Sequence, residues 1–231
     1  MPEGTLRIID GSNDITIQYV YVFEAVIANK QAYSSIVPVI LAAGDSKRMG
    51  YPKALLPMGK EVFLTRILRV LREAGLARPR LILGRDAPLI KAYIGGYPAD
   101  ILINPNPDRG QLSSIQLGIF GLPENFEAGM IWPVDQPGVS VGLICRLAEL
   151  FVTKVCRIAV PFRDGKRGHP AIFHRTLFHE FMNAPMDKGA KGIISRYESE
   201  TCFLPTDEGA AFDDIDTPAE YRTLLDSFIS S

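Results

Sequence analysis

The sequence predicts an α/β protein built on one mostly parallel β-sheet with helices packed on both of its faces. From Ile36 onward, short apolar runs alternate with longer segments of helical periodicity, which is the pattern of β-α-β units. The chain has 231 residues, of which 47% are hydrophobic, enough for a single sizeable domain with its own core. Polar and glycine residues follow several apolar runs, where parallel sheets bind their ligands. We therefore expect one domain over residues 36–231, with a site at the carboxyl ends of its strands.

Residues 1–35 stand apart from this domain. Apolar and aromatic residues at every second position predict a strand there, and they are Ile15, Ile17, Tyr19, Tyr21 and Phe23. We expect either an added edge strand or hairpin, or upstream sequence from a wrongly assigned start, although no second methionine occurs before Met49. Neither interpretation assigns a function to this N-terminal extension.

The first half of the domain is expected to alternate strands and helices. A buried strand over Ile36–Ile40 opens into a loop at residues 41–53. The helix over Val62–Ala74 is the clearest, because its apolar residues form one stripe and Gly75 stands where a C-terminal cap belongs. The elements expected after it are a strand at Arg80–Gly84, a helix at Ala87–Tyr93, a strand at Asp100–Ile103 and a helix at Gln111–Phe120.

The second half continues the alternation with shorter elements. A strand at Met130–Val134 is followed by a helix at Val139–Val155. The later elements expected are short strands at Arg157–Pro161 and Ala171–Phe173, and helices at Arg175–Met182, Lys188–Arg196 and Thr217–Ser227. Helices of this length between strands imply crossover connections that cover both faces of the sheet.

Composition excludes several classes of protein. Lys plus Arg number 25 and Asp plus Glu number 26, so the net charge of 25 − 26 = −1 gives no reason to expect nucleic-acid or acidic-membrane binding. No apolar stretch reaches the roughly 18 residues of a membrane-spanning helix, and no secretory signal is evident. The three cysteines are widely spaced, which argues against a zinc knuckle or a disulfide framework. We expect a cytoplasmic protein that binds neither nucleic acid nor membrane.

The loop after the first strand carries the most chemical information. Residues 41–53 read Leu-Ala-Ala-Gly-Asp-Ser-Lys-Arg-Met-Gly-Tyr-Pro-Lys, a turn of small residues that holds three cations. Small residues let backbone N–H groups approach a ligand closely, and cations neutralise a polyanion. The spacing from Gly44 to Gly50 is not that of a Walker A loop, and no Gly-x-Gly-x-x-Gly supports a dinucleotide site. The loop therefore indicates a nucleoside triphosphate site.

Acidic residues stand next to two later elements of the predicted fold. Asp135 ends the strand Met130–Val134, where a carboxylate can hold Mg²⁺ against triphosphate oxygens or can serve as an Asx-turn residue. A second acidic cluster at residues 213–216 precedes the last helix. Thr217 and Glu220 form a capping box there, so helix initiation alone explains part of this second motif.

Two further segments offer polar groups. The segment Gly110-Gln-Leu-Ser-Ser114 lies near an expected helix N-terminus and can read a base edge, bind a phosphate, or simply cap the helix. The basic loop Arg163–Pro170 contains Lys166, Arg167 and His169, which can grip the phosphate of an acceptor or form a solvated turn.

Together these motifs resemble the MobA-like nucleotidyltransferases. Leu41-Ala-Ala-Gly-x-Ser-x-Arg-Met-Gly-x-Pro-Lys53 is similar to the signature loop of that family. Shorter motifs follow in the order of the family: Leu83-Gly84, Asn104-Pro105, Gly110-Gln-Leu-Ser-Ser-Ile115, Pro133-Val-Asp-Gln-Pro137, Gly168-His-Pro170 and Asp214-Ile-Asp-Thr-Pro218. The resemblance covers the chain from about Val37 to its C-terminus and implies a three-layer Rossmann-like nucleotidyltransferase fold.

The resemblance implies roles for individual residues. Arg48, Lys53 and Asp135 would be catalytic, the two cations at the β- and γ-phosphates and the carboxylate at Mg²⁺. Asp216, or else Asp214, would be the second metal ligand. The implied nucleotide-binding residues are Leu41, Ala42, Ala43, Gly44, Arg48, Lys53, Gly84, Asn104, Gly110, Ser113 and Ser114.

Within the family, the sequence is most similar to the molybdenum cofactor cytidylyltransferase branch. Guanylyl-transferring relatives typically carry Leu-Ala-Gly-Gly in the first loop and Gly-Pro-Leu-Ala-Gly where this chain has Gly110 to Ser114, so the resemblance favours CTP. Arg167, His169 and Asp187 would lie on the acceptor side. Met186 and Lys191 stand where the family has glycine and arginine, and a lysine does not reproduce the bidentate contact of an arginine.

The resemblance thus implies Mg²⁺-dependent transfer of CMP from CTP to the terminal phosphate of an acceptor, molybdopterin, with release of pyrophosphate. A molybdoenzyme or its chaperone would be a partner. Three alternatives stay open: a guanylyltransferase of the same cofactor pathway, a cytidylyltransferase acting on a sugar or polyol phosphate, and a catalytically idle nucleotide-binding protein that delivers a cofactor.

Overall fold

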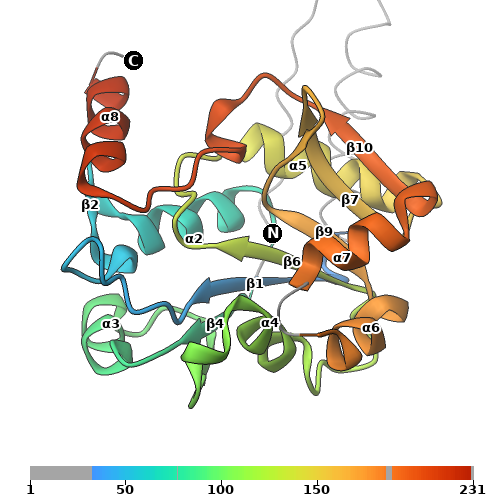
Figure 1. Ribbon diagram of the computed structural model, residues 1–231, viewed down its shortest axis with the longest axis horizontal. Helices are drawn as coiled ribbons and strands as arrows, with labels where there is room; N and C mark the ends of the chain where they lie inside the picture. Colours follow the sequence, from blue (N-terminus) through green and yellow to red (C-terminus); the bar gives the residue numbers. More distant parts are fainter. Residues whose placement is uncertain (1–32, 77, 186–188, 230–231) are drawn as a thin grey trace, which may run out of the picture.

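The computed structural model describes residues 33–76, 78–185 and 189–229 as one central sheet with helices on both faces (Figure 1). The strand predicted at residues 15–23 and the acceptor-side residue Asp187 lie outside the described residues. Within the described ranges, no helix is both long enough and apolar enough to cross a membrane.

The central sheet has the strand order β10-β7-β9-β6-β1-β4-β5. Its strands are β1 (Ile36–Ala42), β4 (Arg80–Leu83), β5 (Asp100–Ile103), β6 (Ala128–Pro133), β7 (Ile158–Arg163), β9 (Ala171–His174) and β10 (Thr201–Pro205), with β8 (Lys166–Arg167) paired to β7. β1 is parallel to β4 and β6, β4 to β5, and β10 to β7, whereas β9 runs antiparallel between β6 and β7. The expectation of a mostly parallel sheet is confirmed, and its parallel strands end at one common edge.

Helices cover the two faces separately (Figure 1). On one face lie α2 (Phe63–Glu73), α3 (Ala87–Ile94) and α5 (Val141–Thr153), and on the other lie α4 (Gln111–Ile119), α6 (Phe178–Asn183) and α7 (Gly189–Arg196). The last helix, α8 (Pro218–Ile229), contacts α2 through an edge-on pair of Tyr221 and Phe63, whose ring centroids are 5.8 Å apart.

Short elements connect these layers. β2 (Pro57–Met58) and β3 (Glu61–Val62) form a separate antiparallel pair before α2. Single turns of 3-10 helix are η1 (Lys53–Leu55), η2 (Pro107–Arg109), η3 (Arg175–Leu177), η4 (Glu198–Glu200) and η5 (Gly209–Ala211).

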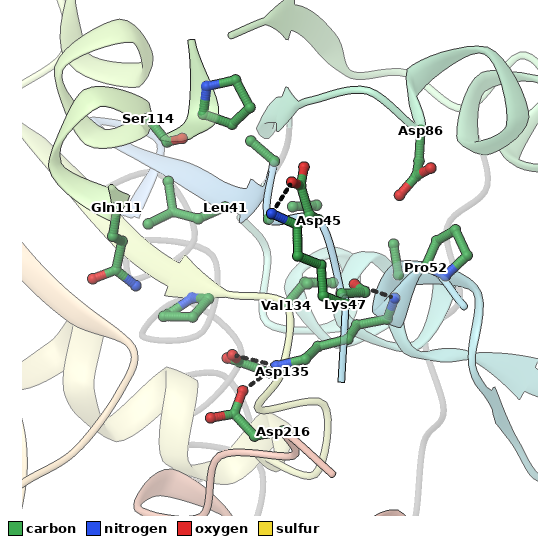
Figure 2. Close-up of a pocket in the computed structure, with 18 of the residues that line it drawn as sticks. Leu41, Asp45, Lys47, Pro52, Asp86, Gln111, Ser114, Val134, Asp135 and Asp216 are labelled. Carbon is green, nitrogen blue, oxygen red and sulfur yellow. Dashed lines mark hydrogen bonds and ion pairs between the residues drawn. The ribbon is translucent and has the colours of Figure 1, made fainter. Parts of the chain in front are cut away.

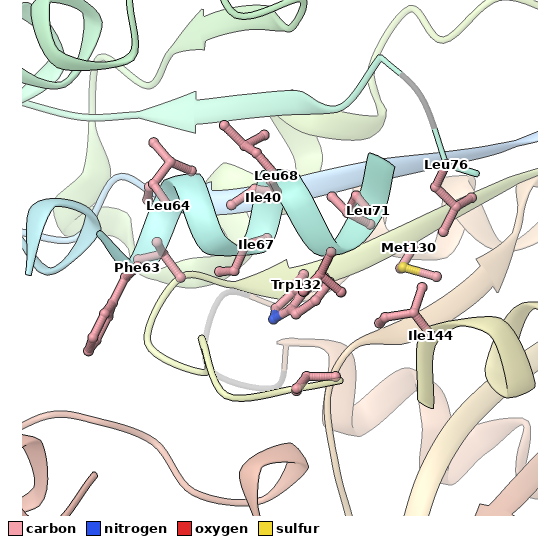
Figure 3. Packing of buried hydrophobic residues seen from close by; sticks show 14 of the residues in the cluster. Ile40, Phe63, Leu64, Ile67, Leu68, Leu71, Leu76, Met130, Trp132 and Ile144 are labelled. Atoms are coloured by element: carbon pink, nitrogen blue, oxygen red, sulfur yellow. The ribbon is translucent and has the colours of Figure 1, made fainter. Parts of the chain in front are cut away.

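Strand β1 is the centre of the core. All seven of its residues are buried, and Ile36 and Ile40 face the helices α2 and α5 whereas Val37 and Val39 face α4. Figure 3 shows Ile40 beneath α2, with Trp132 of the neighbouring strand β6 beside it. The indole N–H of Trp132 donates a hydrogen bond of 3.0 Å to the carbonyl oxygen of Gln136. A buried indole needs such a partner, and this bond also fixes the turn directly after Asp135.

From Ile36 onward the predicted helices and strands are confirmed, with small shifts at their ends, and the pattern fails at three places. It does not predict the pair β2 and β3, the hairpin strand β8 inside the basic loop, or the edge strand β10. β8 is two residues long and β10 is only half-buried, so neither shows clear period-2 alternation. The helix expected from Arg175 begins instead as the 3-10 turn η3, with the side chain of His174 accepting a hydrogen bond from the N–H of Thr176.

The packing of α4 against β1 requires a glycine at position 118. A Cβ atom there would lie 2.3 Å from Cγ1 of Val39, which is fully buried. Alanine improves helix propensity by up to about 1 kcal/mol, but an overpacked core typically costs about 1–3 kcal/mol. We expect Gly118→Ala to lower the free energy of unfolding by about 1–2 kcal/mol, measured by chemical denaturation.

Gly96→Ala is the matched control for this prediction. An added Cβ at Gly96 meets nothing within 4 Å, and the backbone there is not in the left-handed region. We expect the denaturation midpoint of Gly96→Ala to equal that of the unsubstituted protein. If Gly118→Ala has the same midpoint as this control, the close approach of α4 to β1 does not constrain the fold.

Candidate active site

A cavity of about 410 Å³ opens at the carboxyl ends of β1 and β6 (Figure 2). It draws its wall from distant parts of the chain: residues 41–48, 52–54 and 133–135, together with Asp86, Ile90, Pro107, Gly110, Gln111, Ser114 and Asp216. The structure therefore brings the loop after β1, Asp135, the start of α4 and Asp216 to one place. The first three were expected there from the ends of parallel strands, and Asp216 from the family resemblance.

The loop between β1 and η1 is held by its own backbone and by Ser46. The carbonyl oxygen of Ser46 accepts hydrogen bonds from the N–H groups of Met49 at 2.9 Å and Gly50 at 3.1 Å. Its hydroxyl accepts a hydrogen bond of 3.0 Å from the N–H of Lys53. Gly50 has a φ of +67°, a conformation that glycine adopts without steric cost. Ser46 thereby ties the start of the loop to Lys53, the first residue of η1.

Lys53 joins two carboxylates in the wall of the cavity. Its ammonium donates to Oδ2 of Asp135 at 3.2 Å and to Oδ1 of Asp216, and Figure 2 shows these two carboxylates close together. Arg48 donates to the other oxygen of Asp216 at 2.7 Å. The side chain of Lys53 is 13% exposed and that of Arg48 is 67% exposed. A chain of alternating charges thus runs from the half-buried Asp135 to the solvent-exposed Arg48.

The two carboxyl groups have opposite electrostatic environments. Burial raises the pKa of Asp135 above its ordinary value, and the neighbouring Lys53 only partly offsets this. The hydrogen bond from Lys53, more than any other contact, holds the pKa of Asp216 below its ordinary value. Asp135 is therefore the carboxylate whose ionised form would gain most from an additional cation.

The donor set fits a divalent cation shared with a phosphate ligand. Oδ1 of Asp135 is buried and has no hydrogen-bond partner among the described residues. Within those residues, no group of three or more His, Cys, Asp or Glu side chains is arranged to hold a metal. Mg²⁺ is usually bound by one or two carboxylates together with substrate phosphates. Asp135 and Asp216, which meet at Lys53, match that requirement.

The two candidates for the second metal ligand occupy different positions. Asp216 meets Asp135 through Lys53, whereas Asp214 accepts a hydrogen bond of 2.7 Å from Nε2 of Gln136. Glu220 holds the backbone at Asp216, because its Oε2 accepts the N–H groups of Asp216 at 2.8 Å and Thr217 at 2.7 Å. The capping box predicted from the sequence therefore also orients Asp216, and the geometry favours Asp216 over Asp214.

Three predicted nucleotide-binding residues, Gly84, Asn104 and Ser113, do not line the cavity. They support its wall instead. A Cβ at Gly84 would lie 2.3 Å from the carbonyl oxygen of Ala43, so glycine lets the end of β4 approach the loop after β1. The side-chain amide of Asn104 donates to the hydroxyls of Ser113 and Ser114, both at 2.9 Å.

These contacts fix the beginning of α4. Gly110, its N-cap, has a φ of +88°, in the left-handed region that favours glycine. Gly110, Gln111 and Ser114 line the cavity from this side. The predicted residues Leu41, Ala42, Ala43 and Gly44 line it from the end of β1.

Arg167 and His169, the two predicted acceptor-side residues that the structure describes, do not line the cavity. Arg167 donates to the hydroxyl of Ser195 at 3.1 Å and to Glu198 at 3.0 Å. His169 has a buried Nδ1 without a hydrogen-bond partner among the described residues, and burial lowers its pKa. Neither residue joins the cluster of Lys53 and its two carboxylates.

Several residues of the cavity wall were not predicted as site residues from the sequence, among them the polar residues Asp45, Ser46 and Asp86. Ser46 stands in the signature loop, so its place in that motif was an available signal. Asp45 stands at a variable position of that loop and Asp86 lies outside every recognised motif, so their place in the wall depends on how the loops after β1 and β4 come together.

Comparison with known proteins agrees with this geometry. The family model of the MobA-like NTP transferase domain matches residues 38–201. A molybdenum cofactor guanylyltransferase of Rhizobium meliloti (strain 1021) is 32% identical over 197 residues, which cover 80% of this chain and 88% of that protein.

Solved structures of similar proteins share the fold of this chain. The crystal structure of Rv0371c from Mycobacterium tuberculosis H37Rv superposes with a TM-score of 0.72 at 28% identity, over 83% of this chain and 98% of that one. A complex of Rv0371c with manganese superposes with a TM-score of 0.66 at 27% identity, with the same coverage of 83% and 98%.

The family match includes the signature loop, Gly110 to Ser114 and Asp135, and the resemblance inferred from the motifs is confirmed at the level of the family. The α/β fold with a mostly parallel sheet is shared with the solved structures described above. The chain belongs to the family of MobA-like NTP transferase domains and is a nucleotidyltransferase.

Proposed function

We propose that this protein transfers CMP from CTP to the terminal phosphate of an acceptor and releases pyrophosphate. The observation that carries the proposal is the position of Lys53 between Asp135 and Asp216, with Arg48 beside them in one cavity wall. Cations that neutralise a triphosphate and carboxylates that hold a metal ion are the groups that nucleotidyl transfer requires.

The residues of the chain act by positioning and by charge neutralisation. Arg48 and Lys53 neutralise the β- and γ-phosphates and the departing pyrophosphate. An oxygen of the acceptor phosphate forms a bond to the α-phosphorus while the bond from that phosphorus to the bridging oxygen breaks, in line. Because a phosphate nucleophile is already ionised near neutral pH, no general base is needed.

Asp135 and Asp216 are the proposed ligands of Mg²⁺, which when bound supplies positive charge to the triphosphate oxygens. Lys53 then exchanges its two carboxylate partners for phosphate oxygens. The unpartnered Oδ1 of Asp135 supports this assignment. The manganese complex of the relative Rv0371c is consistent with a divalent cation.

CTP is favoured as the donor by two segments of the sequence. They are Leu-Ala-Ala-Gly at the end of β1 and Gly110 to Ser114 at the start of α4, both of which line the cavity in part. GTP is the second candidate, because the Rhizobium meliloti relative is named a guanylyltransferase.

Molybdopterin is the proposed acceptor, on the strength of that relative's name. Arg167, His169 and Asp187 are proposed to lie on the acceptor side. A molybdoenzyme or its chaperone would receive the product, and a cytoplasmic location is part of the same proposal. A sugar or polyol phosphate as acceptor, or an idle cofactor-delivery role, are the alternatives that the assays below distinguish.

We expect Asp135→Asn to reduce pyrophosphate release by roughly 100-fold or more, the size of effect seen when one electrostatic contact to a transition state is lost. Its stability should not fall. Because burial raises the pKa of Asp135, folding favours the protonated carboxyl, so Asp135 makes the native protein less stable as pH rises through that pKa. Thermal unfolding from pH 4 to 8 should show Asp135→Asn losing less stability with rising pH than the unsubstituted protein.

Lys60→Ala is the control for this experiment, since Lys60 is an exposed cation outside the cavity wall. It should leave both pyrophosphate release and the pH profile of unfolding unchanged. An Asp135→Asn protein with near-normal turnover would remove the carboxylate from the proposed mechanism.

The donor nucleotide is decided by measuring pyrophosphate release from CTP, GTP, ATP and UTP, each with and without molybdenum cofactor. We expect turnover that depends on Mg²⁺, is fastest with CTP and requires the cofactor. Fastest turnover with GTP would select the guanylyltransferase alternative, and turnover only with a sugar or polyol phosphate would replace the acceptor. Nucleotide binding with no turnover under any condition would support the idle cofactor-delivery protein.

A further inference from the structure

Arg85 links two loops that no motif connects. It follows the end of β4, and its guanidinium contacts Oδ2 of Asp45 through one terminal nitrogen and Oδ2 of Asp108 through the other, the second at 2.5 Å. Asp45 belongs to the loop after β1, and Asp108 belongs to η2, directly before α4. One planar cation therefore spans two segments that are far apart in the sequence.

The two linked segments both contribute to the cavity wall. Asp45 and its neighbours line the cavity from the end of β1, and Pro107, Gly110 and Gln111 line it from η2 and α4. These are also the two segments that the proposed function assigns to the nucleotide.

Asp45 depends on this cation for its charge balance. Its side chain is only 16% exposed, and its Oδ1 is buried with no hydrogen-bond partner among the described residues. Its Oδ2 contacts Arg85 and also the exposed Lys47 at 3.3 Å. An uncompensated carboxylate in the wall of a polyanion site would repel the ligand, and Arg85 cancels that charge.

Stabilisation of the fold does not explain the ion pair between Arg85 and Asp108. The side chains of Arg85 and Asp108 are 57% and 65% exposed, and ion pairs this exposed contribute little to folding stability. An arginine holds two acceptors at a fixed separation because its guanidinium is planar, a property that lysine lacks. Geometry rather than stability is what the arrangement provides.

We propose that Arg85 is a positioning and specificity-determining residue of the nucleotide site, which holds the loop after β1 and η2 at the separation that selects the base. This inference rests on the proposed function, because it requires that the cavity bind a nucleoside triphosphate. It adds to that function a residue whose hydrogen-bond partners among the described residues, Asp45 and Asp108, are neither the proposed metal ligands nor the proposed phosphate-binding cations.

The test is binding calorimetry at fixed Mg²⁺ with CTP, GTP, ATP, UTP and inorganic tripolyphosphate. Four variants are compared with the unsubstituted protein: Arg85→Ala, Arg85→Lys, the double substitution Arg85→Ala with Asp45→Asn, and Arg109→Ala. The affinity for tripolyphosphate measures the effect of the charge of the cavity wall. The ratio of the affinities for the four nucleotides measures the effect of the separation between η2 and the loop after β1. Arg109 is the control, an exposed arginine of the same turn η2 that does not line this cavity.

We expect Arg85→Ala to weaken tripolyphosphate binding about fivefold, the effect of one partly exposed charge contact, and to reduce the discrimination among nucleotides. Arg85→Lys and the double substitution should recover the affinity for tripolyphosphate. The lysine again places a cation beside Asp45, and the double substitution removes the negative charge at position 45. Neither should recover the discrimination. Arg109→Ala should change neither quantity, and the melting temperatures of all variants should stay close to one another.

Three results would overturn the inference. They are unchanged nucleotide discrimination in Arg85→Ala, full recovery of discrimination by Arg85→Lys, and an unsubstituted protein that binds all four nucleotides equally. The failure of the proposed function looks different, because the unsubstituted protein would then bind neither nucleotides nor tripolyphosphate.

Discussion

The ion pairs of Lys53 with Asp135 and Asp216 are the contacts on which the rest of the site depends. Asp135 is largely buried, and a carboxylate in that position is unfavourable unless a cation lies beside it. Lys53, in the loop after the first strand of the sheet, supplies that cation. It also forms an ion pair with Asp216, which lies near the end of the sequence. The same three groups can neutralise a triphosphate and hold its metal ion, so one set of charges serves both the unliganded and the proposed liganded site.

The sheet makes this cluster possible. β1 and β6 are parallel neighbours, so the loop that carries Lys53 and the turn that carries Asp135 leave the sheet at the same edge. Two contacts keep them there. Gly84 lets the end of β4 approach Ala43 closely, and the indole of Trp132 donates a hydrogen bond to the turn after Asp135. α8 then brings Asp216 to the edge, with Glu220 holding its backbone.

Prediction of helices and strands from the sequence succeeded where burial of an element leaves a periodic pattern of apolar residues. The apolar stripe of α2 and the buried run of β1 each predicted their element, since burial on one or both faces leaves a periodic signal. It failed for β8 and β10, which are short or half-buried and leave no such signal. Among the site residues, Arg48, Lys53 and Asp135 were found as cavity residues, whereas Gly84, Asn104 and Ser113 proved to lie outside its wall.

The sequence by itself determined the fold class, the family and the place of Arg48, Lys53 and Asp135 in the site, because the signature loop is contiguous and the later motifs adjoin recognisable elements. Only the tertiary structure decided which acidic residue meets Lys53, and it favours Asp216 over Asp214. It alone showed that Arg85 joins Asp45 to Asp108. These contacts form between segments that are distant along the chain, and their partners are set by how the loops meet at the edge of the sheet, which no local pattern of residues encodes.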